Sequence, residues 1–394
     1  MTRKKLIFVI TTHPIQYMAP WYRDIDNIKE FDFHVLFFRE PNASQQGIGF
    51  GQAFKWDTPL REGYKNVVLG LPEGGRSLVS SIITLRRHIA FHKPDVILIT
   101  GWNEPLLALA YPMLKAMRLP VIVRGEANDL RSRGRFARTV HRILLKFVDA
   151  AVQIGSANRR FYLMNGLTKD KIFNGAYFVN TKHMLAMSLA NQDQRQTLRV
   201  TQGFEENDFV FTFVGKHVPF KRPMMIVEAA ALCRQKGFPV KLLFAGSGEL
   251  THTLKSRAQE LGVKVFFTGF LNQSEMWKAY VSADVFVLPS TNGETWGLVT
   301  NEAMLFGLPV IVCDEVGCAE DLVVEGETGY TFNGQVEDLA NVMIRIASDR
   351  NRAVAMGLAG RQRVIELFSM PVATNGLLDA IDYVLHARHR TVNA

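Results

Sequence analysis

Residues 284–314 read DVFVLPSTNGETWGLVTNEAMLFGLPVIVCD, and this stretch decides the fold. Its first apolar run, DVFVLPS, has the length and the Val, Phe and Leu content of a buried strand. A polar loop follows, and then an apolar segment predicts a helix from Leu298 to Phe306, closed by Gly307. The second apolar run, LPVIVCD, begins at once. A strand, loop, helix and strand in this order are typical of a parallel sheet that helices cover on both faces.

The same alternation of short apolar runs and longer amphipathic ones continues along the chain. The other runs that predict strands are KLIFVI, FHVLFF, DVILIT, PVIVR, AAVQIG, FVFTFVG, KLLFAG and VFFTG. The alternation occurs twice, and a polar stretch at residues 191–208 separates the two series. We therefore expect an α/β protein with two doubly wound, Rossmann-like domains over residues 1–200 and 207–370. A last helix at residues 371–394 could pack against either domain, including back on the N-terminal one.

Length and composition agree with this expectation and exclude several classes of protein. A chain of 394 residues, 47% hydrophobic and 21% charged, is long enough for two globular domains. The apolar runs are shorter than the ~20 residues of a membrane span. The opening MTRKKLIFVITTHP has an apolar run of only about five residues and favours a first strand over a signal peptide. Three cysteines with neither a disulfide framework nor zinc-site spacing indicate a reducing cytoplasm.

The charge is unevenly distributed between the two halves of the chain. Residues 1–200 contain 29 Lys and Arg against 15 Asp and Glu, whereas residues 201–394 contain 17 against 22. The basic N-terminal half therefore indicates an anionic partner, for which nucleic acid, a lipid surface and a phosphorylated substrate are the candidates. The chain contains no recognisable nucleic-acid-binding module, so we expect no nucleic-acid partner.

Two glutamates in residues 284–314 are candidates for binding a ligand at the carboxyl end of a strand. The predicted helix starts at Gly297 and Leu298, where free N–H groups form an anion site and the glycine allows close approach. Glu302 lies one turn further on, where a buried carboxylate would need donors such as two ribose hydroxyls. Glu294, in the loop with Thr295, could accept from sugar hydroxyls. The alternative is that Glu302 is a surface helix residue and Glu294 an ordinary turn residue.

Two lysines follow another predicted strand. In FVGKHVPFKRP, the strand ends at Gly215, Lys216 follows, and Lys221 lies five residues on, before a helix. Two ammonium groups at the carboxyl end of a strand suit a diphosphate and its developing negative charge. A Gly-x-Gly turn at Gly246 and Gly248 follows the next predicted strand and is weak evidence by itself.

Together these elements form a specific pattern. The order is Gly-Lys-(four)-Lys, Gly-x-Gly, Glu-(seven)-Glu and GLPVIVCDEVGCAEDLV, each after a strand. This order resembles the retaining glycosyltransferases of family four, which have the GT-B fold of two facing Rossmann-like domains. The resemblance is specific over about residues 209–340 and looser in the N-terminal half.

The resemblance implies a nucleoside-diphosphate-sugar donor and assigns roles to individual residues. Lys216 and Lys221 would hold the diphosphate, Glu302 the ribose and Glu294 the sugar. Uridine is the favoured base and guanosine the second. Two positions depart from the family pattern: Trp296 replaces the commoner Phe or Tyr, and Cys318 the second Gly of a Gly-Gly pair. The implied donor-binding set is Gly215, Lys216, Lys221, Phe270, Leu271, Glu294, Thr295, Trp296, Gly297, Leu298 and Glu302, with Phe270 and Leu271 cradling the base.

The N-terminal half offers further candidates for the acceptor side. His13 follows the first strand in a His-Pro-Ile-Gln-Tyr opening that resembles a bacterial subgroup of the family, and would point into the interdomain cleft. Glu126 lies where relatives often place a His beside the reacting sugar, so Arg124 or Glu126 is expected to touch donor or acceptor. The catalytic candidates are Lys216, Lys221, Glu294, His13 and Glu126.

One predicted helix in this half carries a basic face made by Arg135, Arg138, Arg142 and Lys146. A basic amphipathic helix can lie on an anionic membrane, and the alternative is a core-packed helix whose basic face is solvated. Asp24-x-Asp26 resembles a metal motif of a different glycosyltransferase fold, but it lies far from the donor elements. We therefore expect neither a metal nor another cofactor, because the lysines can neutralise the phosphates.

The sequence thus predicts a metal-independent, retaining glycosyltransferase. It would move a sugar from a nucleotide sugar to a glycan or lipid-linked acceptor, in bacterial surface polysaccharide or glycoconjugate synthesis. We expect a cytoplasmic protein, peripheral on the inner face of the membrane. The rival enzyme is a UDP-sugar 2-epimerase of the same fold, and the rival without catalysis is a silent subunit that binds nucleotide sugars.

Overall fold

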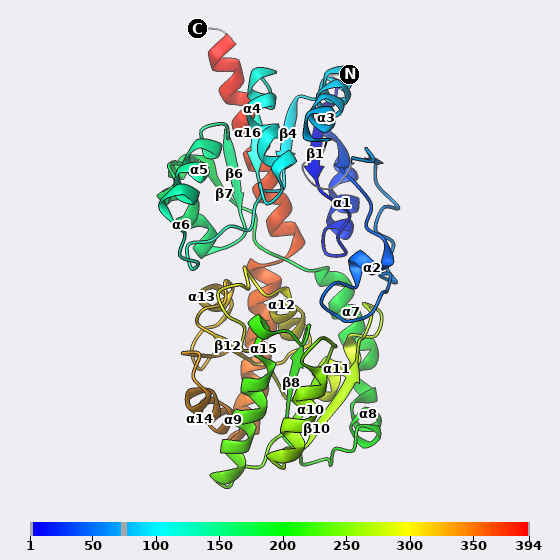
Figure 1. Ribbon diagram of the computed structural model, residues 1–394, viewed down its shortest axis with the longest axis vertical. Coiled ribbons are helices and arrows are strands. Elements are labelled where there is room, and N and C mark those ends of the chain that lie inside the picture. Colours follow the sequence, from blue (N-terminus) through cyan, green and yellow to red (C-terminus); the bar gives the residue numbers. More distant parts are fainter. Residues whose placement is uncertain (1–2, 72–76, 393–394) are drawn as a thin grey trace. The chain divides into compact units, whose positions relative to one another are not determined.

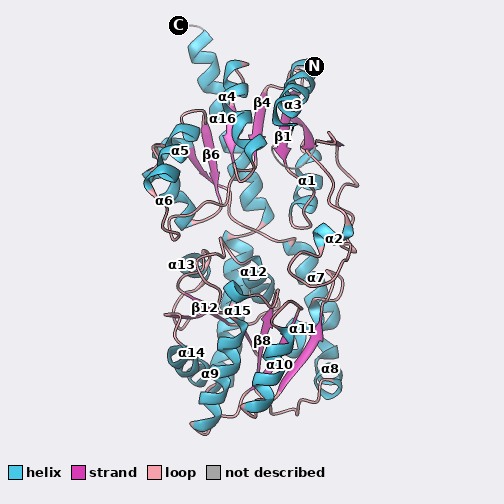
Figure 2. Ribbon diagram, in the orientation of Figure 1, coloured by secondary structure: helices cyan, strands magenta, loops and turns pink. Residues whose placement is uncertain are grey.

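The computed structural model describes residues 3–71 and 77–392, and each of its two compact units has one parallel sheet with helices around it (Figures 1 and 2). The chain does not divide between the units at a single point. Unit 1 consists of Met1–Asn42, Pro59–Tyr177 and Met370–Ala394, and unit 2 consists of Ala43–Thr58 and Phe178–Ser369.

Unit 1 is built on a seven-stranded sheet in the order β3-β2-β1-β4-β5-β6-β7, and every pairing is parallel. Its strands are rich in Val, Ile and Phe, and four of them are buried along almost their whole length, as a sheet covered on both faces requires. The strands are β1 (Lys5–Thr11), β2 (Phe31–Phe37), β3 (Asn66–Val68), β4 (Val96–Ile99), β5 (Val121–Val123), β6 (Ala150–Gln153) and β7 (Ile172–Asn174). The helices are α1 (Met18–Asp26), α3 (Leu78–His92), α4 (Pro105–Ala116), α5 (Arg135–Leu145), α6 (Ser156–Met164) and α16 (Met370–Val392).

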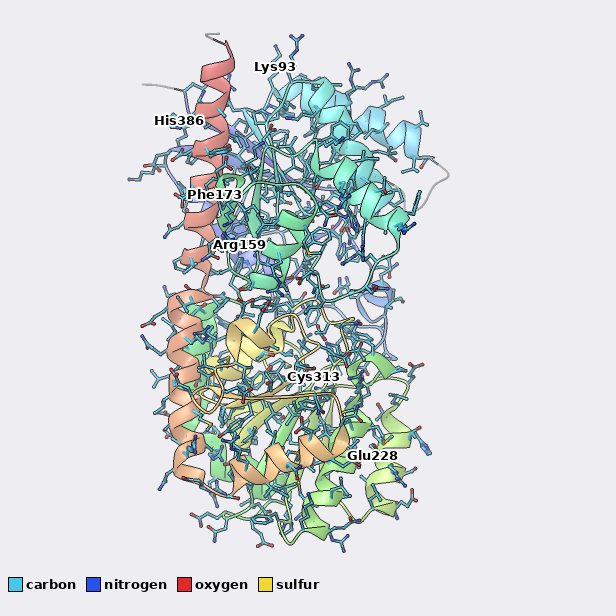
Figure 3. The ribbon with its side chains drawn as sticks, turned by 90° about the vertical axis from the view of Figure 1, so that its left-hand side faces the viewer. Lys93, Arg159, Phe173, Glu228, Cys313 and His386 are labelled. Carbon is cyan, nitrogen blue, oxygen red and sulfur yellow. The ribbon has the colours of Figure 1, made fainter. Side chains whose placement is uncertain are left out.

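Helix α16 returns the end of the chain to unit 1. The indole N–H of Trp21 donates to the Thr374 hydroxyl at 2.9 Å, and the Tyr383 ring lies 5.5 Å from the Phe173 ring. In Figure 3, Phe173 lies beside this helix. A Cβ atom at Gly376 would come within 1.9 Å of the Asn174 carbonyl oxygen, so only glycine allows this close approach to β7.

Unit 2 is built on a six-stranded sheet in the order β10-β9-β8-β11-β12-β13, again parallel throughout. The strands are β8 (Val210–Val214), β9 (Lys241–Ala245), β10 (Val265–Gly269), β11 (Val285–Leu288), β12 (Val310–Cys313) and β13 (Gly329–Phe332). The helices are α2 (Ala43–Gln46), α7 (Thr181–Asn191), α8 (Arg195–Thr201), α9 (Pro223–Gln235), α10 (Thr251–Glu260), α11 (Trp277–Ser282), α12 (Leu298–Leu305), α13 (Ala319–Leu322), α14 (Val336–Ala347) and α15 (Arg350–Leu367).

The strand order of unit 2 reverses between β8 and β11, which are hydrogen-bonded neighbours. Chains leaving the carboxyl ends of two such strands turn to opposite faces of the sheet and leave a crevice, where α/β proteins bind ligands. Lys216 follows β8 and Glu294 follows β11. The two motifs that the sequence analysis singled out therefore meet at the topological switch point.

The division into units differs from the predicted boundary in two places. Residues 178–200, which we expected in the N-terminal domain, belong to unit 2 because α7 and α8 pack on α11 and α12. Arg195 and Arg199 of α8 pair with Asp284 at 2.6 Å and 3.5 Å, which attaches this segment to the amino end of β11. Residues 43–58 also belong to unit 2, although the strands before and after them lie in unit 1.

One helical stretch, Arg350–Ala387, is long and apolar enough to cross a membrane by length and composition, and half of its most apolar window is buried inside the protein. The stretch contains α15 and most of α16, which belong to different units. A core helix passes the same test of length and composition, so this feature is weak evidence for a membrane span.

Candidate functional site

The loops after β8 and β9 approach each other closely at the carboxyl edge of the unit 2 sheet. A Cβ atom at Gly246 would lie 1.9 Å from the carbonyl oxygen of Gly215, so a side chain there would force the two loops apart. After Gly215, Lys216 leads into a 3-10 turn at Pro219–Lys221, which places the second lysine before α9. Both lysines thus lie at the predicted position.

Lys216 is a partly buried cation that lacks a close counter-charge. Within residues 3–71 and 77–392, no carboxylate oxygen lies within 4.0 Å of its ammonium group. Burial lowers the pKa of Lys216, the neighbouring Lys221 charge lowers it further, and the Glu294 carboxylate raises it. An anion bound here would supply the charge that the ammonium group needs.

Lys221 and Glu294 form an ion pair across the switch point. The Lys221 ammonium group donates to Oε2 of Glu294, and the Ser290 hydroxyl donates to the same oxygen at 3.3 Å. The side chains of the pair are only 13% and 15% exposed, so solvent screens their attraction weakly. In this structure each charge is therefore neutralised by the other, and a ligand has to rearrange the pair to use either group.

Glu302 is buried in α12 with a relative exposure of 1%, so the alternative that it is a surface helix residue is wrong. The Tyr280 hydroxyl donates to Oε2 at 2.7 Å, and Oε1 is buried without a hydrogen-bond partner among the described residues. Burial raises the pKa of Glu302 to about 7, although the Tyr280 bond acts in the opposite direction. One oxygen of this buried carboxyl group therefore lacks a hydrogen-bond donor among the described residues.

Helix α12 begins at Leu298 after Gly297, whose φ of 95° is the left-handed conformation that favours glycine. No side chain caps this helix start, so its first N–H groups remain available to an anion. The side chain of Trp296 is 2% exposed, its indole N–H donates to Asn301 at 2.8 Å, and its ring lies 5.7 Å from Phe368. The Trp296 side chain is therefore a core residue, and only its backbone faces the loop at Thr295.

Phe270 and Leu271 follow β10 and are both partly buried. Phe270 is not open to solvent on its ring face, because Phe54 lies 4.2 Å and Phe50 5.1 Å from it between ring centroids. Both of these rings come from residues 43–58, which the sequence analysis did not connect with the site.

The other catalytic candidates lie in unit 1, at the carboxyl edge of its sheet. His13 follows β1, and its Nδ1 is joined to the Thr12 hydroxyl by a 2.8 Å hydrogen bond. Glu126 follows β5, is exposed, and accepts from the Tyr177 hydroxyl. Arg124 is buried, donates to the Ala176 carbonyl at 2.9 Å and lies over aromatic rings. Arg124 is thus held by the fold of unit 1, whereas Glu126 is accessible.

The basic helix and the aspartate motif also lie in unit 1. The four cations of the predicted basic face are exposed on and just after α5, while Leu144 and Leu145 face the core. Phe136 on the same helix is 84% exposed, so the solvent-facing side of the helix also carries an apolar side chain. Asp24 and Asp26 both lie in α1, and residues two apart on a helix do not face one another. Among the described residues, no group of three or more His, Cys, Asp and Glu side chains could hold a metal ion.

Two residues of the site were missed by the sequence analysis. Among the described residues, Tyr280 supplies the only hydrogen bond to the Glu302 side chain, and Ser290 donates to Glu294. Ser290 closes the quoted run DVFVLPS, so its place beside the loop was visible in the sequence. No sequence pattern pointed to Tyr280 as a partner of Glu302, because it lies 22 residues earlier on a different helix.

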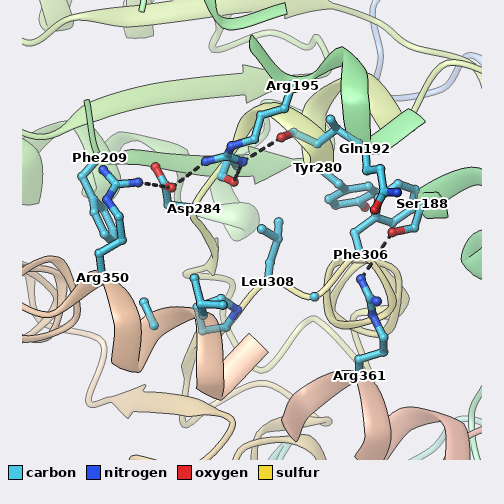
Figure 4. A pocket seen from close by; sticks show the side chains of 16 residues that line it. Ser188, Gln192, Arg195, Phe209, Tyr280, Asp284, Phe306, Leu308, Arg350 and Arg361 are labelled. Carbon is cyan, nitrogen blue, oxygen red and sulfur yellow. Dashed lines mark hydrogen bonds and ion pairs between the residues drawn. The ribbon is translucent and has the colours of Figure 1, made fainter. Parts of the chain in front are cut away.

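A cavity of about 390 Å³ lies at the opposite, amino edge of the unit 2 sheet (Figure 4). Asp284, in its wall, holds Arg195 at 2.6 Å and Arg350 at 2.8 Å, so these charges join helices α8 and α15 to β11. Tyr280 and Phe306 also line it, with ring centroids 5.1 Å apart. None of the predicted site residues lines this cavity, and we assign the function to the carboxyl edge instead.

Solved structures similar to this chain define the class of fold. A glycosyltransferase from Rickettsia africae ESF-5 superposes with a TM-score of 0.74 at 15% identity, over 97% of this chain and 99% of that chain. Anabaena Alr3699/HepE, solved in complex with UDP-glucose, gives a TM-score of 0.68 at 17% identity, over 97% and 99%. With its two Rossmann-like units, the protein has the GT-B fold.

Sequence comparison finds relatives for part of the chain. Residues 194–363 match the sequence model of the family described as Glycosyl transferases group 1. Sulfoquinovosyl transferase SQD2 of Arabidopsis thaliana is 38% identical over 175 residues, which are 43% of this chain and 32% of that protein. A GDP-mannose-dependent phosphatidylinositol monomannoside mannosyltransferase of Mycobacterium tuberculosis is 35% identical over 160 residues, 38% of this chain and 41% of that protein. The matching region thus spans less than half of the length of each of these relatives.

Proposed function

We propose that this protein is a retaining glycosyltransferase that moves a sugar from a nucleoside-diphosphate sugar to a glycan or lipid-linked acceptor. UDP-sugars are the favoured donors and GDP-sugars the second choice. The context would be the synthesis of bacterial surface polysaccharide or glycoconjugate. The Anabaena neighbour was solved with UDP-glucose and the Mycobacterium relative uses GDP-mannose, which supports a nucleotide-sugar donor without deciding its base.

The observation that carries the proposal is the meeting of four charged residues at one switch point. Lys216 and Lys221 follow β8, and Glu294 follows the neighbouring β11, with Glu302 in the helix after it. In the proposed complex, Lys216, Lys221 and the free N–H groups at the start of α12 neutralise the diphosphate. The unpartnered oxygen of Glu302 accepts a ribose hydroxyl, and Glu294 exchanges part of its pairing with Lys221 for hydroxyls of the sugar.

The proposed chemistry breaks the bond between the anomeric carbon and the phosphate oxygen. The two lysines stabilise the negative charge that grows on the leaving diphosphate, so the proposal needs no metal and no other cofactor. The acceptor oxygen forms its bond to the anomeric carbon on the face that the phosphate leaves. The acceptor proton passes to the departing phosphate oxygen, which retains the configuration. Glu294 binds hydroxyls in this scheme and does not act as a nucleophile.

For the acceptor side, we propose roles for His13 and Glu126 at the carboxyl edge of the unit 1 sheet. His13 would orient the transferred sugar or its acceptor, and the exposed Glu126 would bind acceptor hydroxyls. The His-Pro-Ile-Gln-Tyr opening supports membership of the bacterial subgroup with the same opening.

A lipid-linked acceptor would bring the protein to a membrane surface, and we propose α5 as the contact. Around this helix, Arg131, Arg133, Arg138 and Arg142 line a cavity of about 130 Å³ that suits an anionic headgroup. The exposed Phe136 could insert between lipids. The protein would then be cytoplasmic and peripheral on the inner face of the membrane.

Titration of UDP and GDP into the full chain tests the donor site. Wild type is expected to bind UDP more tightly than GDP. Lys216→Ala should weaken UDP binding by roughly 10- to 100-fold, since one charge-assisted contact to the diphosphate is lost. Lys182→Ala removes an exposed lysine on α7 and serves as the matched control. Equal affinity of Lys216→Ala and wild type, or no binding by wild type, would contradict the proposal.

A further inference from the structure

Residues 43–58, which we name the strap, leave unit 1 after β2 and dock on unit 2 before the chain returns to β3. Polar contacts fasten the strap along its length. The Ser247 hydroxyl donates to the Phe50 carbonyl at 2.6 Å, and the Asn272 amide donates to the Lys55 carbonyl at 2.8 Å. Near its end, the Asp57 carboxylate accepts from the backbone N–H of Ser274 at 3.1 Å. The strap is therefore a defined part of unit 2.

The aromatic side chains of the strap cover Phe270. Phe54 lies against it with ring centroids 4.2 Å apart and a 37° angle between the ring planes, while Phe50 and Trp56 lie 5.1 Å and 6.3 Å away. A base inserted between Phe54 and Phe270 would need the rings about 7–8 Å apart, because stacked carbon atoms keep about 3.5–4.0 Å. The face of Phe270 that Phe54 covers is therefore closed to a base.

The strap also covers the lysine at the end of β8. The Lys216 ammonium group lies 5.0 Å from the centre of the Phe50 ring, a cation–π distance. A Cβ atom at Gly49 would lie 2.8 Å from Cδ of Lys216, which shows how closely the strap backbone passes. A diphosphate would offer this ammonium group charge-assisted hydrogen bonds, which are stronger than a contact with a ring face.

We propose that the strap and the nucleotide compete for the same surface of unit 2. Resting on the proposed function, the inference is that Phe54 stands in for the base on Phe270 and Phe50 stands in for the diphosphate over Lys216. The nucleotide binds by displacing both rings, and the strap returns when the site empties. The strap is a built-in lid that weakens nucleotide binding, and Phe54 and Phe50 are the residues that set its strength.

The sign of one affinity change tests the competition. UDP is titrated into the full-length Phe54→Ala variant, and we expect a Kd roughly three- to tenfold lower than that of wild type, because one aromatic contact of the competitor is lost. Asp57→Ala removes the hydrogen bond from the Ser274 backbone N–H to the Asp57 carboxylate without changing a ring. It should also lower the Kd for UDP. Phe91→Ala removes an equally large but 81% exposed ring in unit 1 and should leave the Kd unchanged.

Hydrogen exchange gives an independent readout in the wild type. In the docked strap, the Asp57 amide N–H donates to the side-chain oxygen of Asn272 at 3.3 Å. UDP should raise exchange at residues 43–58, since the strap leaves its partners. Slower exchange with UDP, or a higher Kd for both strap variants, would mean that the strap is a fixed wall of the site and would overturn the inference alone. If neither wild type nor variants bind UDP or GDP, the proposed function fails with it.

Discussion

Lys221 and Glu294 are 73 positions apart in the sequence and form an ion pair that joins the loops after β8 and β11. The pair couples two functions that the proposal gives to different parts of the donor, since Lys221 holds the diphosphate and Glu294 the sugar. A donor that engages one of them changes the charge felt by the other. Stability and catalysis should therefore respond differently when the pair is altered.

Replacing one member of this pair should lower stability, and replacing both should not. In Lys221→Met the partly buried Glu294 loses its counter-charge, and we expect a loss of about 1–3 kcal/mol in the free energy of unfolding. The double variant Lys221→Met, Glu294→Gln removes both charges and should recover most of that loss. Urea denaturation measures each value. Additive losses in the double variant would mean that the two side chains do not interact in solution.

Catalysis should not recover in the double variant. Each of Lys221→Met and Glu294→Gln should lower kcat by roughly 10²–10³-fold, the usual effect of removing one preorganised electrostatic contact to the transition state. Steady-state release of nucleotide from the donor measures it. A double variant that regains wild-type kcat would show that the pair serves stability only.

The raised pKa of Glu302 should make the stability of the protein fall as the pH rises. Its pKa in the folded protein is about 7, above the ordinary value of 4.5, so between these values the folded state keeps a proton that the unfolded state has lost. Stability should therefore fall as the pH rises from about 4.5 to 7, by up to about 3 kcal/mol at higher pH. Glu302→Gln cannot ionise and should lack this loss.

The measurement is the difference in unfolding free energy between wild type and Glu302→Gln from pH 4.5 to 8. Glu302→Gln should become the more stable protein as the pH rises. Tyr280→Phe removes the hydrogen bond that lowers this pKa, so the loss should still begin near pH 4.5 but should continue to a higher pH than in wild type and be larger in total. If the difference in unfolding free energy between the two proteins did not change with pH, the raised pKa of Glu302 would be contradicted.

Trp296 should affect stability much more than donor affinity. Its indole is buried, donates to Asn301 and packs on Phe368. Trp296→Phe loses one buried hydrogen bond and some packing, and should lower the unfolding free energy by about 1–3 kcal/mol. The KM for the donor should change less than about threefold, because a smaller aromatic ring takes the place of the indole inside the core. A large change in KM without loss of stability would mean that the Trp296 side chain contacts the donor.

The basic surface of α5 should govern binding to anionic membranes. Arg138→Glu, Arg142→Glu reverses two charges and should weaken binding to phosphatidylglycerol vesicles at least about 30-fold, at about 1 kcal/mol per cation. The matched control Arg86→Glu, Arg87→Glu makes the same change at exposed positions of α3. Vesicle sedimentation measures binding. Equal losses in both variants would mean that net charge matters and α5 does not.

Much of the fold was predictable because most of its strands are buried and read as apolar runs between polar or glycine-containing segments. All ten predicted strands are present, and the helix expected at 298–306 is α12, at Leu298–Leu305. The missed strands, β3, β7 and β13, are all edge strands, and β3 and β7 are only partly buried, so their segments NVV, IFN and GYTF do not stand out as buried apolar runs.

The site was predictable in its residues but not in its contacts. Strand endings identified Lys216, Lys221, Glu294 and Glu302, because ligands of parallel sheets bind where strands end. The pairing of Lys221 with Glu294 depends on β8 and β11 being neighbours, which no local pattern determines. The docking of the strap on Phe270 likewise depends on contacts between residues more than 200 positions apart.

The central claim is that the switch point between β8 and β11 binds a nucleoside-diphosphate sugar and transfers its sugar. The most direct test measures nucleotide release from a panel of UDP-, GDP- and ADP-sugars, with and without a membrane-lipid extract. Wild type should consume one donor, the extract should raise the rate, and the product should keep the anomeric configuration of the donor by NMR. Lys221→Ala and Glu294→Ala should both lose this activity. Release that survives in both variants, or no release from any donor with the extract present, would contradict the account.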